Sequence, residues 1–118
     1  MQSRSYWTGT SSDNLVIGQS TNDLTRYNLS LQNDVDIVEI NEAFASMAVY
    51  CRDKLQLDWE KLNPRGGAIA LGHPFGMTGI RQIVTGLSEC RRRGKKILLT
   101  SMCMGTGMGM AALFVSEQ

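Results

Sequence analysis

The stretch VDIVEINEAFASMAVYCRDKL, residues 35–55, changes from one hydrophobic pattern to another part-way along its length. The apolar residues of Val35–Ile40 form a short run that is typical of a buried strand. From Glu42 to Leu55 the apolar residues recur at helical spacing, and Asn41 stands just before them in the position of an N-cap. A buried strand that passes directly into a helix is a building unit of α/β folds, so this stretch predicts that fold class.

Further helices are predicted downstream of this stretch. A short one is possible at Trp59–Leu62, and the Asn-Pro-Arg-Gly-Gly sequence that follows is a helix breaker. A long helix is predicted from Gly76 or Met77 to Arg93, because Gly94 is suited to end it. Its apolar residues lie on one face of the helix: Ile80, Ile83, Val84, Leu87 and Cys90.

The remaining segments predict strands and turns. Ala68–Leu71 is either a buried strand or an extended loop, and residues 72–74 turn the chain. Strands are predicted at Lys96–Met102 and Met108–Val115, joined by a tight loop at Cys103–Gly107. These two strands are close enough along the chain to form an antiparallel pair. Together the elements indicate an α/β layer in which helices pack on a mixed sheet.

The composition excludes several classes of protein. The chain has 118 residues and a mass of 13.0 kDa, which fits one domain. Lys and Arg number 12 against 11 Asp and Glu, so the net charge of +1 gives no reason to expect nucleic acid or an acidic membrane as a partner. No apolar run approaches the ~18 residues of a membrane span. Three widely spaced cysteines predict neither a disulfide framework nor a metal site, and they fit a reducing compartment.

The first 33 residues differ from the rest. They are rich in Ser, Thr, Asn, Gln and Asp, and their hydrophobic periodicity is weak. We therefore expect a polar, weakly structured segment at residues 1–33 and a domain at residues 34–118. Within the first segment, residues 1–14 are expected to be a tail without the apolar stretch of a secretory signal. Val16 and Ile17 predict a short strand or turn, and Asp23–Leu31 a marginal helix.

Two polar residues lie where strands or loops meet helices, which is where open α/β sheets place their sites. Asn41 follows the first strand, and its amide either caps the helix or holds a water or a substrate carbonyl. His73 is the only histidine, and it stands ahead of a helix. The helix dipole favours a neutral ring there, which can polarise a carbonyl or accept a proton from a thiol. The alternative is a turn histidine that only caps a loop.

Cys103 is the third candidate. It follows a strand and precedes Gly105 and Gly107, whose backbone freedom lets N–H groups point at a developing oxyanion. Its thiol either acts as a nucleophile or proton carrier, or is a buried cysteine beside a tight turn. Cys51 and Cys90 lie on apolar helix faces and are expected in the core.

Other patterns predict no chemistry. The basic run at residues 91–96 is either a solvated helix end that complements the helix dipole, or a phosphate-binding segment. Glu42 is a favourable acid in the first turn of a helix, with no assigned reaction. The sequence has no HExxH and no paired cysteines, so no metal is expected.

Three segments together resemble the C-terminal half of thiolases, enzymes that make or cleave 3-ketoacyl-CoA. They are VEINEAFA at residues 38–45, NPRGGAIALGHP at 63–74 and SMCMGTGMG at 101–109. Their order and spacing fit the family, and the resemblance covers about residues 34–115. The sequences of the second and third segments look most like those of peroxisomal 3-ketoacyl-CoA thiolases, above all the fungal ones.

The resemblance implies a fold and a set of roles. The fold is one half of a duplicated five-layer α-β-α-β-α arrangement. His73 would activate a cysteine that the substrate acylates, and Asn41 would hold the water that completes an oxyanion hole with it. Cys103 would carry the proton to and from the second acyl group or CoA. The backbone N–H of Gly105 would contribute to a second oxyanion hole.

The resemblance also implies partners. The acylated cysteine belongs to the N-terminal half of the family's fold, and neither Cys51 nor Cys90 has a matching context. We therefore expect the chain to be inactive alone and to work with such a half or in a homo-oligomer. Acyl-CoA and CoA are substrates and no cofactor is expected; the sequence assigns no residue to CoA binding. By resemblance the location is the peroxisome, otherwise the cytoplasm or mitochondrion. The alternative to an acyltransferase is a non-enzymatic remnant or interaction module. Without the N-terminal half, the chain alone is expected to expose apolar faces or an unpaired strand edge.

Overall fold

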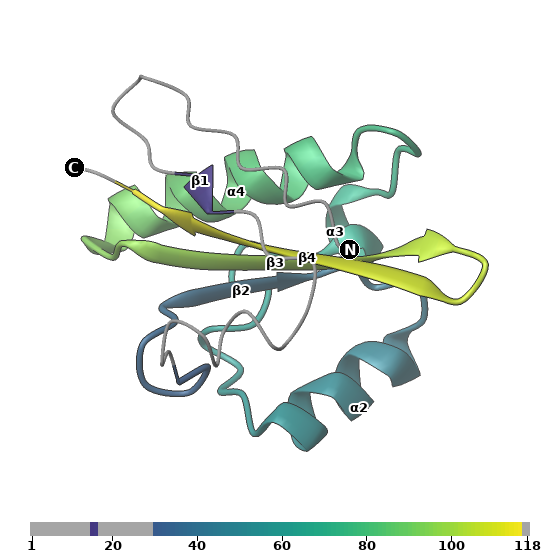
Figure 1. Ribbon diagram of the computed structural model, residues 1–118, viewed down its shortest axis with the longest axis horizontal. Helices are drawn as coiled ribbons and strands as arrows, with labels where there is room; N and C mark the ends of the chain where they lie inside the picture. Colours follow the sequence, from purple (N-terminus) through teal and green to yellow (C-terminus); the bar gives the residue numbers. More distant parts are fainter. Residues whose placement is uncertain (1–14, 17–29, 117–118) are drawn as a thin grey trace, which may run out of the picture.

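A computed structural model describes residues 15–16 and 30–116, and it shows a sheet with helices on both faces (Figure 1). The order of the four strands in the sheet is β1-β4-β3-β2. The strands are β1 (Leu15–Val16), β2 (Ile37–Ile40), β3 (Ile97–Gly105) and β4 (Met108–Val115). The helices are α2 (Ala45–Leu55), α3 (Ala68–Leu71) and α4 (Thr78–Arg93). Helix α4 lies on one face of the sheet and α2 on the other (Figure 1).

The sheet is mixed, as the sequence predicts. Strand β2 runs parallel to β3, with Ile37 opposite Leu98 and Ile40 opposite Ser101. Strands β3 and β4 form an antiparallel hairpin, and β1 pairs antiparallel with β4. A parallel neighbour requires a crossover connection, and the chain between β2 and β3 carries all three helices of the described residues. The α/β class and the antiparallel pairing of the last two strands are therefore confirmed.

Alternation along the strands divides the core between the two faces of the sheet. One cluster includes Val38, Ile40 and Leu99, and the half-buried Cys51 of α2 packs against it. The other includes Ile37, Leu98 and Cys90 of α4. Cys90 is fully buried, and burial raises the pKa of its thiol to about 11. The core assignment of Cys90 is confirmed, and Cys51 lies at the margin of its cluster.

Helix α4 turns a largely polar face toward the sheet. Its buried residues are Thr78, Gln82, Gly86, Glu89 and Cys90. A Cβ on Gly86 would lie 2.4 Å from a Leu98 methyl carbon, so the glycine allows the helix to approach β3 closely. The predicted apolar face does not share one environment, because Ile80 and Val84 are 62% and 63% exposed while Cys90 is buried.

Several predicted boundaries are wrong. Helix α2 begins at Ala45 after an extended Phe44, so Asn41 is not its N-cap. Residues 59–62 form turns and a single bridge rather than a helix. Residues 68–71 form the short helix α3 rather than a strand or extended loop, and Gly66, with φ +89°, turns the chain ahead of it. The predictions for residues 1–14, and for the helix over most of 23–31, lie outside the described residues.

The outer edge of β2 is paired by a segment of the same chain. Val38 N donates to the Lys61 carbonyl and Asn63 N to the Val38 carbonyl. The side chain of Asn63 continues the ladder, with Oδ1 accepting from Ile40 N and Nδ2 donating to the Ile40 carbonyl, both at 2.9 Å. An unpaired strand edge was expected in this sheet; at β2 that expectation is wrong, because one amide side chain substitutes for a further strand.

Candidate functional site

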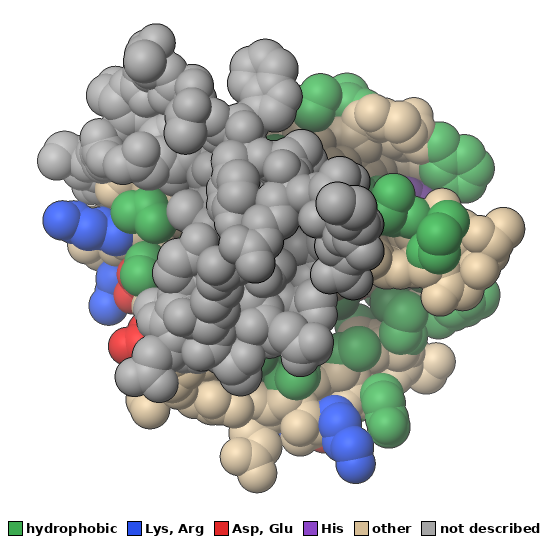
Figure 2. Space-filling view, viewed as in Figure 1, with side chains coloured by type: hydrophobic (Ala, Val, Ile, Leu, Met, Phe, Trp, Pro, Cys, Tyr) green, Lys and Arg blue, Asp and Glu red, His purple; other side chains and the backbone are tan. Residues whose placement is uncertain are grey.

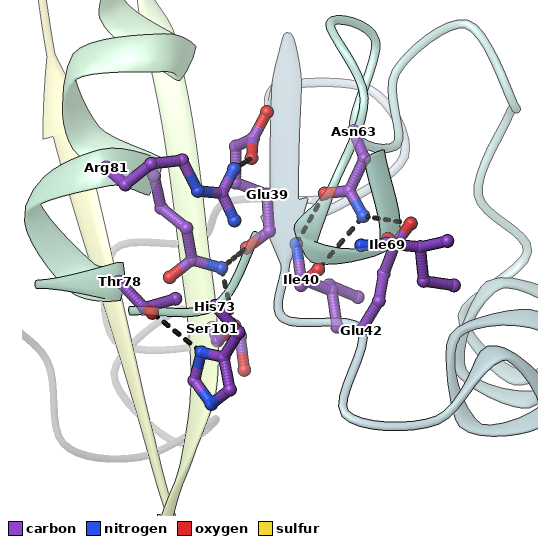
Figure 3. A network of polar contacts seen from close by, with 10 residues as sticks. Glu39, Ile40, Glu42, Asn63, Ile69, His73, Thr78, Arg81 and Ser101 are labelled. Atoms are coloured by element: carbon purple, nitrogen blue, oxygen red, sulfur yellow. Dashed lines mark hydrogen bonds and ion pairs between the residues drawn. The ribbon is translucent and has the colours of Figure 1, made fainter. Parts of the chain in front are cut away.

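The three predicted site segments meet at one edge of the sheet. Strand β2 ends at Ile40, opposite Ser101 of β3, which continues to Gly105, and Asn41 N donates to the Ser101 carbonyl at 2.9 Å. Helix α4 is fixed to the same place, because Gln82 Nε2 donates to the Glu39 carbonyl at 3.2 Å and to the Ser101 carbonyl at 3.1 Å (Figure 3). The start of α4, with His73 ahead of it, therefore lies beside the ends of the strands that carry Asn41 and Cys103. No hydrogen bond joins the three side chains to one another among the described residues.

Asn41 holds an unpaired amide inside the domain. The residue is 1% exposed, and neither Oδ1 nor Nδ2 has a hydrogen-bond partner among the described residues. A buried amide without partners costs free energy, so such groups in folded proteins bind water or a ligand. Of the two alternatives that the sequence left open, capping is excluded by the start of α2. The amide is available for an oxygen or a donor that enters the site.

His73 lies in the loop between α3 and α4. Gly72 precedes it with φ +100°, a conformation that favours glycine, and the ring is half-buried. Nδ1 lies 2.6 Å from Oγ1 of Thr78, and the Phe75 ring packs edge-on with centroids 4.9 Å apart. The Nε2 atom makes no hydrogen bond within residues 30–116. The ring therefore has one fixed nitrogen and one free nitrogen.

Cys103 is exposed on β3, opposite Gly109 of β4. The alternative of a buried cysteine is therefore wrong. The strand continues past it to Gly105 with an irregularity in register, and the turn contains only Thr106 and Gly107. Three successive residues have positive φ: Gly105 at 84°, Thr106 at 51° and Gly107 at 75°. Such backbone turns N–H groups away from the regular ladder, next to an accessible thiol.

A clamp that the sequence analysis missed joins the Asn41 and His73 segments. The carboxylate of Glu42 accepts from Asn63 Nδ2 at 3.1 Å and from Ile69 N, in α3, at 2.9 Å (Figure 3). A Cβ on Gly67 would lie 2.3 Å from the Glu42 carboxyl carbon, so only glycine leaves room for this contact. Glu42 therefore fixes the start of the segment that leads to His73. No local pattern reveals a contact between residues so far apart along the chain.

A buried ion pair joins β2 to α4, on the side of β2 away from Asn63. Arg81 Nη1 of α4 is 3.0 Å from Oε2 of Glu39, and the Glu39 side chain is fully buried (Figure 3). Burial raises the pKa of Glu39 to about 7, against the opposing influence of Arg81. Glu39 Oε1 and Arg81 Nε and Nη2 have no partner within the described residues. The pair attaches α4 to β2, two residues before Asn41.

The basic run at the end of α4 is partly structural. Arg92 and Arg93 both donate to the buried carboxylate of Glu89, and Arg65 lies 3.5 Å from it. The hydrogen bond from Arg92 is the main cause that lowers the pKa of Glu89 to about 2. The predicted solvated helix end fits Arg92, whose side chain is 58% exposed, but Arg92 and Arg93 also neutralise an acid inside the fold, a role that was not predicted.

Two further observations limit the kinds of site that the described residues contain. Within residues 15–16 and 30–116, no three His, Cys, Asp or Glu side chains gather closely enough to hold a metal ion. Nor does that part of the chain contain a helix long and apolar enough to cross a membrane.

Hydrophobic side chains gather at the end of the molecule that carries the β3–β4 turn, as Figure 2 shows. Phe75, Met77, Met104 and Met108 are among the exposed apolar residues near the candidate site.

Comparison with known proteins identifies the family. The sequence model described as "Thiolase, C-terminal domain" matches residues 12–116. The chain belongs to the thiolase family. The peroxisomal 3-ketoacyl-CoA thiolase B of Mus musculus is 65% identical over 83 residues, which are 70% of this chain and 20% of the mouse protein.

Solved thiolases share the fold. Human mitochondrial 3-ketoacyl-CoA thiolase in complex with CoA matches with a TM-score of 0.77 and 44% identity, over 83% of this chain and 25% of that one. The peroxisomal 3-ketoacyl-CoA thiolase of Saccharomyces cerevisiae, described as five-layered and built from two core domains of identical topology, matches with a TM-score of 0.69 and 55% identity. The match covers 80% of this chain and 26% of the yeast chain. The thiolase-like layered fold is therefore confirmed, and the chain spans about a fifth of the length of the curated relatives it matches.

Proposed function

We propose that this thiolase domain is the C-terminal part of a 3-ketoacyl-CoA thiolase, an acyltransferase of fatty-acid β-oxidation. The overall reaction converts 3-ketoacyl-CoA and CoA into acyl-CoA and acetyl-CoA. CoA is a substrate and no cofactor takes part. The acylated cysteine comes from a thiolase N-terminal half, and the working form is an oligomer such as a dimer. The close relatives are named as peroxisomal, which supports the same location for this chain.

Acylation is the first step. The thiol of the N-terminal half's cysteine gives its proton to Nε2 of His73 and attacks the 3-keto carbonyl. The thioester oxygen of the substrate accepts hydrogen bonds from His73 and from a water held by Asn41, which stabilise the negative charge that reaches this oxygen as the departing C2 forms an enolate. The bond between C2 and C3 then breaks, and the thiol of Cys103 protonates the departing C2, giving acetyl-CoA and an acyl-enzyme.

Transfer to CoA is the second step. The Cys103 thiolate takes the proton of the CoA thiol, whose sulfur attacks the acyl-enzyme. The acyl-enzyme's C–S bond breaks, acyl-CoA leaves, and the freed cysteine recovers its proton from His73. The backbone N–H at Gly105 stabilises negative charge on the carbonyl oxygen of the second thioester. Each side chain thus returns to its starting protonation state.

The buried amide of Asn41 is the observation that carries this proposal. Its two polar atoms lack partners within the described residues, although it lies inside the domain. A side chain with only a structural role in such a place would be paired. Its backbone N–H donates to the carbonyl of Ser101, two residues before Cys103 on β3, and Gln82 of α4, the helix that follows His73, donates to the same carbonyl.

The test joins this chain to the N-terminal half of a peroxisomal thiolase and measures thiolytic cleavage of acetoacetyl-CoA. His73→Ala and Cys103→Ala should each lower kcat by roughly 10²–10⁴, the range for a positioned acid–base group. Asn41→Ala should lower it by about 10²–10³, as for loss of one oxyanion donor. Cys51→Ala is the matched control for Cys103→Ala, because Cys51 lies half-buried in α2.

The 118 residues alone should show no turnover, because a base and oxyanion donors without the acylated cysteine cannot form an acyl-enzyme. Turnover by the chain alone that Cys103→Ser abolishes would make Cys103 the nucleophile. Near-normal activity of the joined His73→Ala protein would refute the role of the histidine. A folded joined protein without activity would favour the non-enzymatic module.

A further inference from the structure

The imidazole of His73 is attached to the domain by one hydrogen bond. Its Nδ1 lies 2.6 Å from Oγ1 of Thr78, the first residue of α4, and Figure 3 shows the ring and the hydroxyl facing each other. The ring has no second hydrogen-bond partner within residues 30–116, and its other contact is the edge of the Phe75 ring. The orientation of His73 therefore depends on Thr78.

The hydroxyl hydrogen of Thr78 is already donated to another acceptor. Oγ1 lies 3.0 Å from the Pro74 carbonyl oxygen and donates to it, as Thr hydroxyls do toward the carbonyl four residues earlier. Oγ1 then presents only lone pairs to His73. A contact of 2.6 Å with a lone pair requires a donor, so Nδ1 carries the hydrogen. A neutral imidazole has one N–H, so Nε2 keeps its lone pair.

Thr78 is itself held in place. The residue is 1% exposed, which keeps water from competing for its hydroxyl. One turn further along α4, Gln82 donates to the carbonyls of Glu39 and Ser101, next to the candidate site. The hydroxyl is thus fixed relative to the strand ends. A hydroxyl orients the ring without placing a negative charge against it, unlike the carboxylate that orients histidine in many hydrolases.

We infer that Thr78 is a positioning residue that holds His73 as the Nδ1–H tautomer and aims the basic Nε2 atom into the site. The inference rests on the proposed function, in which Nε2 receives the proton of the acylated cysteine. It adds a residue to which neither the sequence motifs nor the relatives' names assign a role.

The first test is spectroscopic. Nitrogen-15 NMR of the imidazole distinguishes a protonated ring nitrogen from one with a free lone pair, and this chain contributes a single histidine. In the joined protein, His73 is assigned as the signals that His73→Asn removes. At a pH where the ring is neutral, we expect hydrogen on Nδ1. Hydrogen on Nε2, or an even mixture of tautomers, would overturn the inference.

The second test is kinetic and uses the joined protein. Thr78→Val keeps the shape and removes the hydroxyl, and it should lower kcat about 10–100-fold, the range for loss of an orienting partner. KM should change less than about twofold, because substrate contacts are kept. Thr78→Ser should restore most of the activity. Thr85→Val, two turns along α4, is the matched control.

The outcomes separate the two proposals. If His73→Ala is inactive but Thr78→Val keeps normal kcat, the role of Thr78 is refuted and the proposed function stands. A Thr78→Val protein with raised KM and unchanged kcat would also refute positioning of the base. If His73→Ala keeps its activity, the proposed function itself fails.

Discussion

Replacing Glu39 by Gln should remove a specific pH dependence of stability. Glu39 lies under α4 with a fully buried side chain, and burial raises its pKa from 4.5 to about 7. Arg81 opposes this rise, while the charges of Glu42 and Glu89 add to it. The folded state therefore keeps the proton at a pH where the unfolded chain has lost it. The stability that Glu39 contributes is full below pH 4.5 and is lost as the pH rises toward 7.

The size of this loss follows from the same values. A tenfold change in proton affinity corresponds to about 1.4 kcal/mol, so a rise from 4.5 to about 7 amounts to about 3 kcal/mol. The pKa of Glu89 is lowered to about 2, so its stabilising charge develops below pH 4.5. The contribution of Glu89 to stability is therefore constant over the pH range in which Glu39 titrates. Urea unfolding at several pH values from 4.5 to 7.5 should therefore show a fall in the free energy of unfolding that Glu39→Gln abolishes. Glu60→Gln, at an exposed position, is the control. An unchanged slope in Glu39→Gln would refute the reasoning.

Two further predictions concern the edge of the sheet and the outer face of α4. Asn63→Ala removes the side-chain hydrogen bonds to Ile40 N and to the Ile40 carbonyl. It should lower the free energy of unfolding in urea by about 2–4 kcal/mol. Asn33→Ala, at an exposed position, is the control and should change it little. A loss below about 0.5 kcal/mol would contradict the pairing role. The 118-residue chain should self-associate at micromolar concentration in light scattering, because Ile80 and Val84 are exposed. Glu at both positions should shift the mass toward 13.0 kDa, whereas Ser88→Glu should not, and a wild-type monomer would refute this.

Local pattern predicted most of the elements but few of their contacts. The strand near residue 38, the helix that Gly94 ends and the final hairpin each follow from periodicity and turn chemistry over a few neighbouring residues. The helix start after Asn41 was misplaced, because the extended Phe44 is not apparent from spacing. Glu42 illustrates the larger gap. It reads as an ordinary first-turn acid, yet it binds Asn63 and the backbone of Ile69, more than 20 residues away.

The orientation of α4 shows why hydrophobic pattern alone does not decide which face a helix buries. Periodicity predicts one buried stripe, but its members Ile80 and Val84 are exposed, and Gln82 and Gly86 are buried against the sheet beside the rest of the stripe. Two causes act together. The Gln82 amide donates to the carbonyls of Glu39 and Ser101 where β2 ends, and these bonds hold its face of α4 against the sheet. Gly86 then allows contact with Leu98 that a larger residue would prevent. The polar bonds that select this face also hold the first turn of α4, and with it Thr78, beside the strand ends. Ile80 and Val84 are thereby left facing outward, whereas Ile83, Leu87 and Cys90 pack against the sheet.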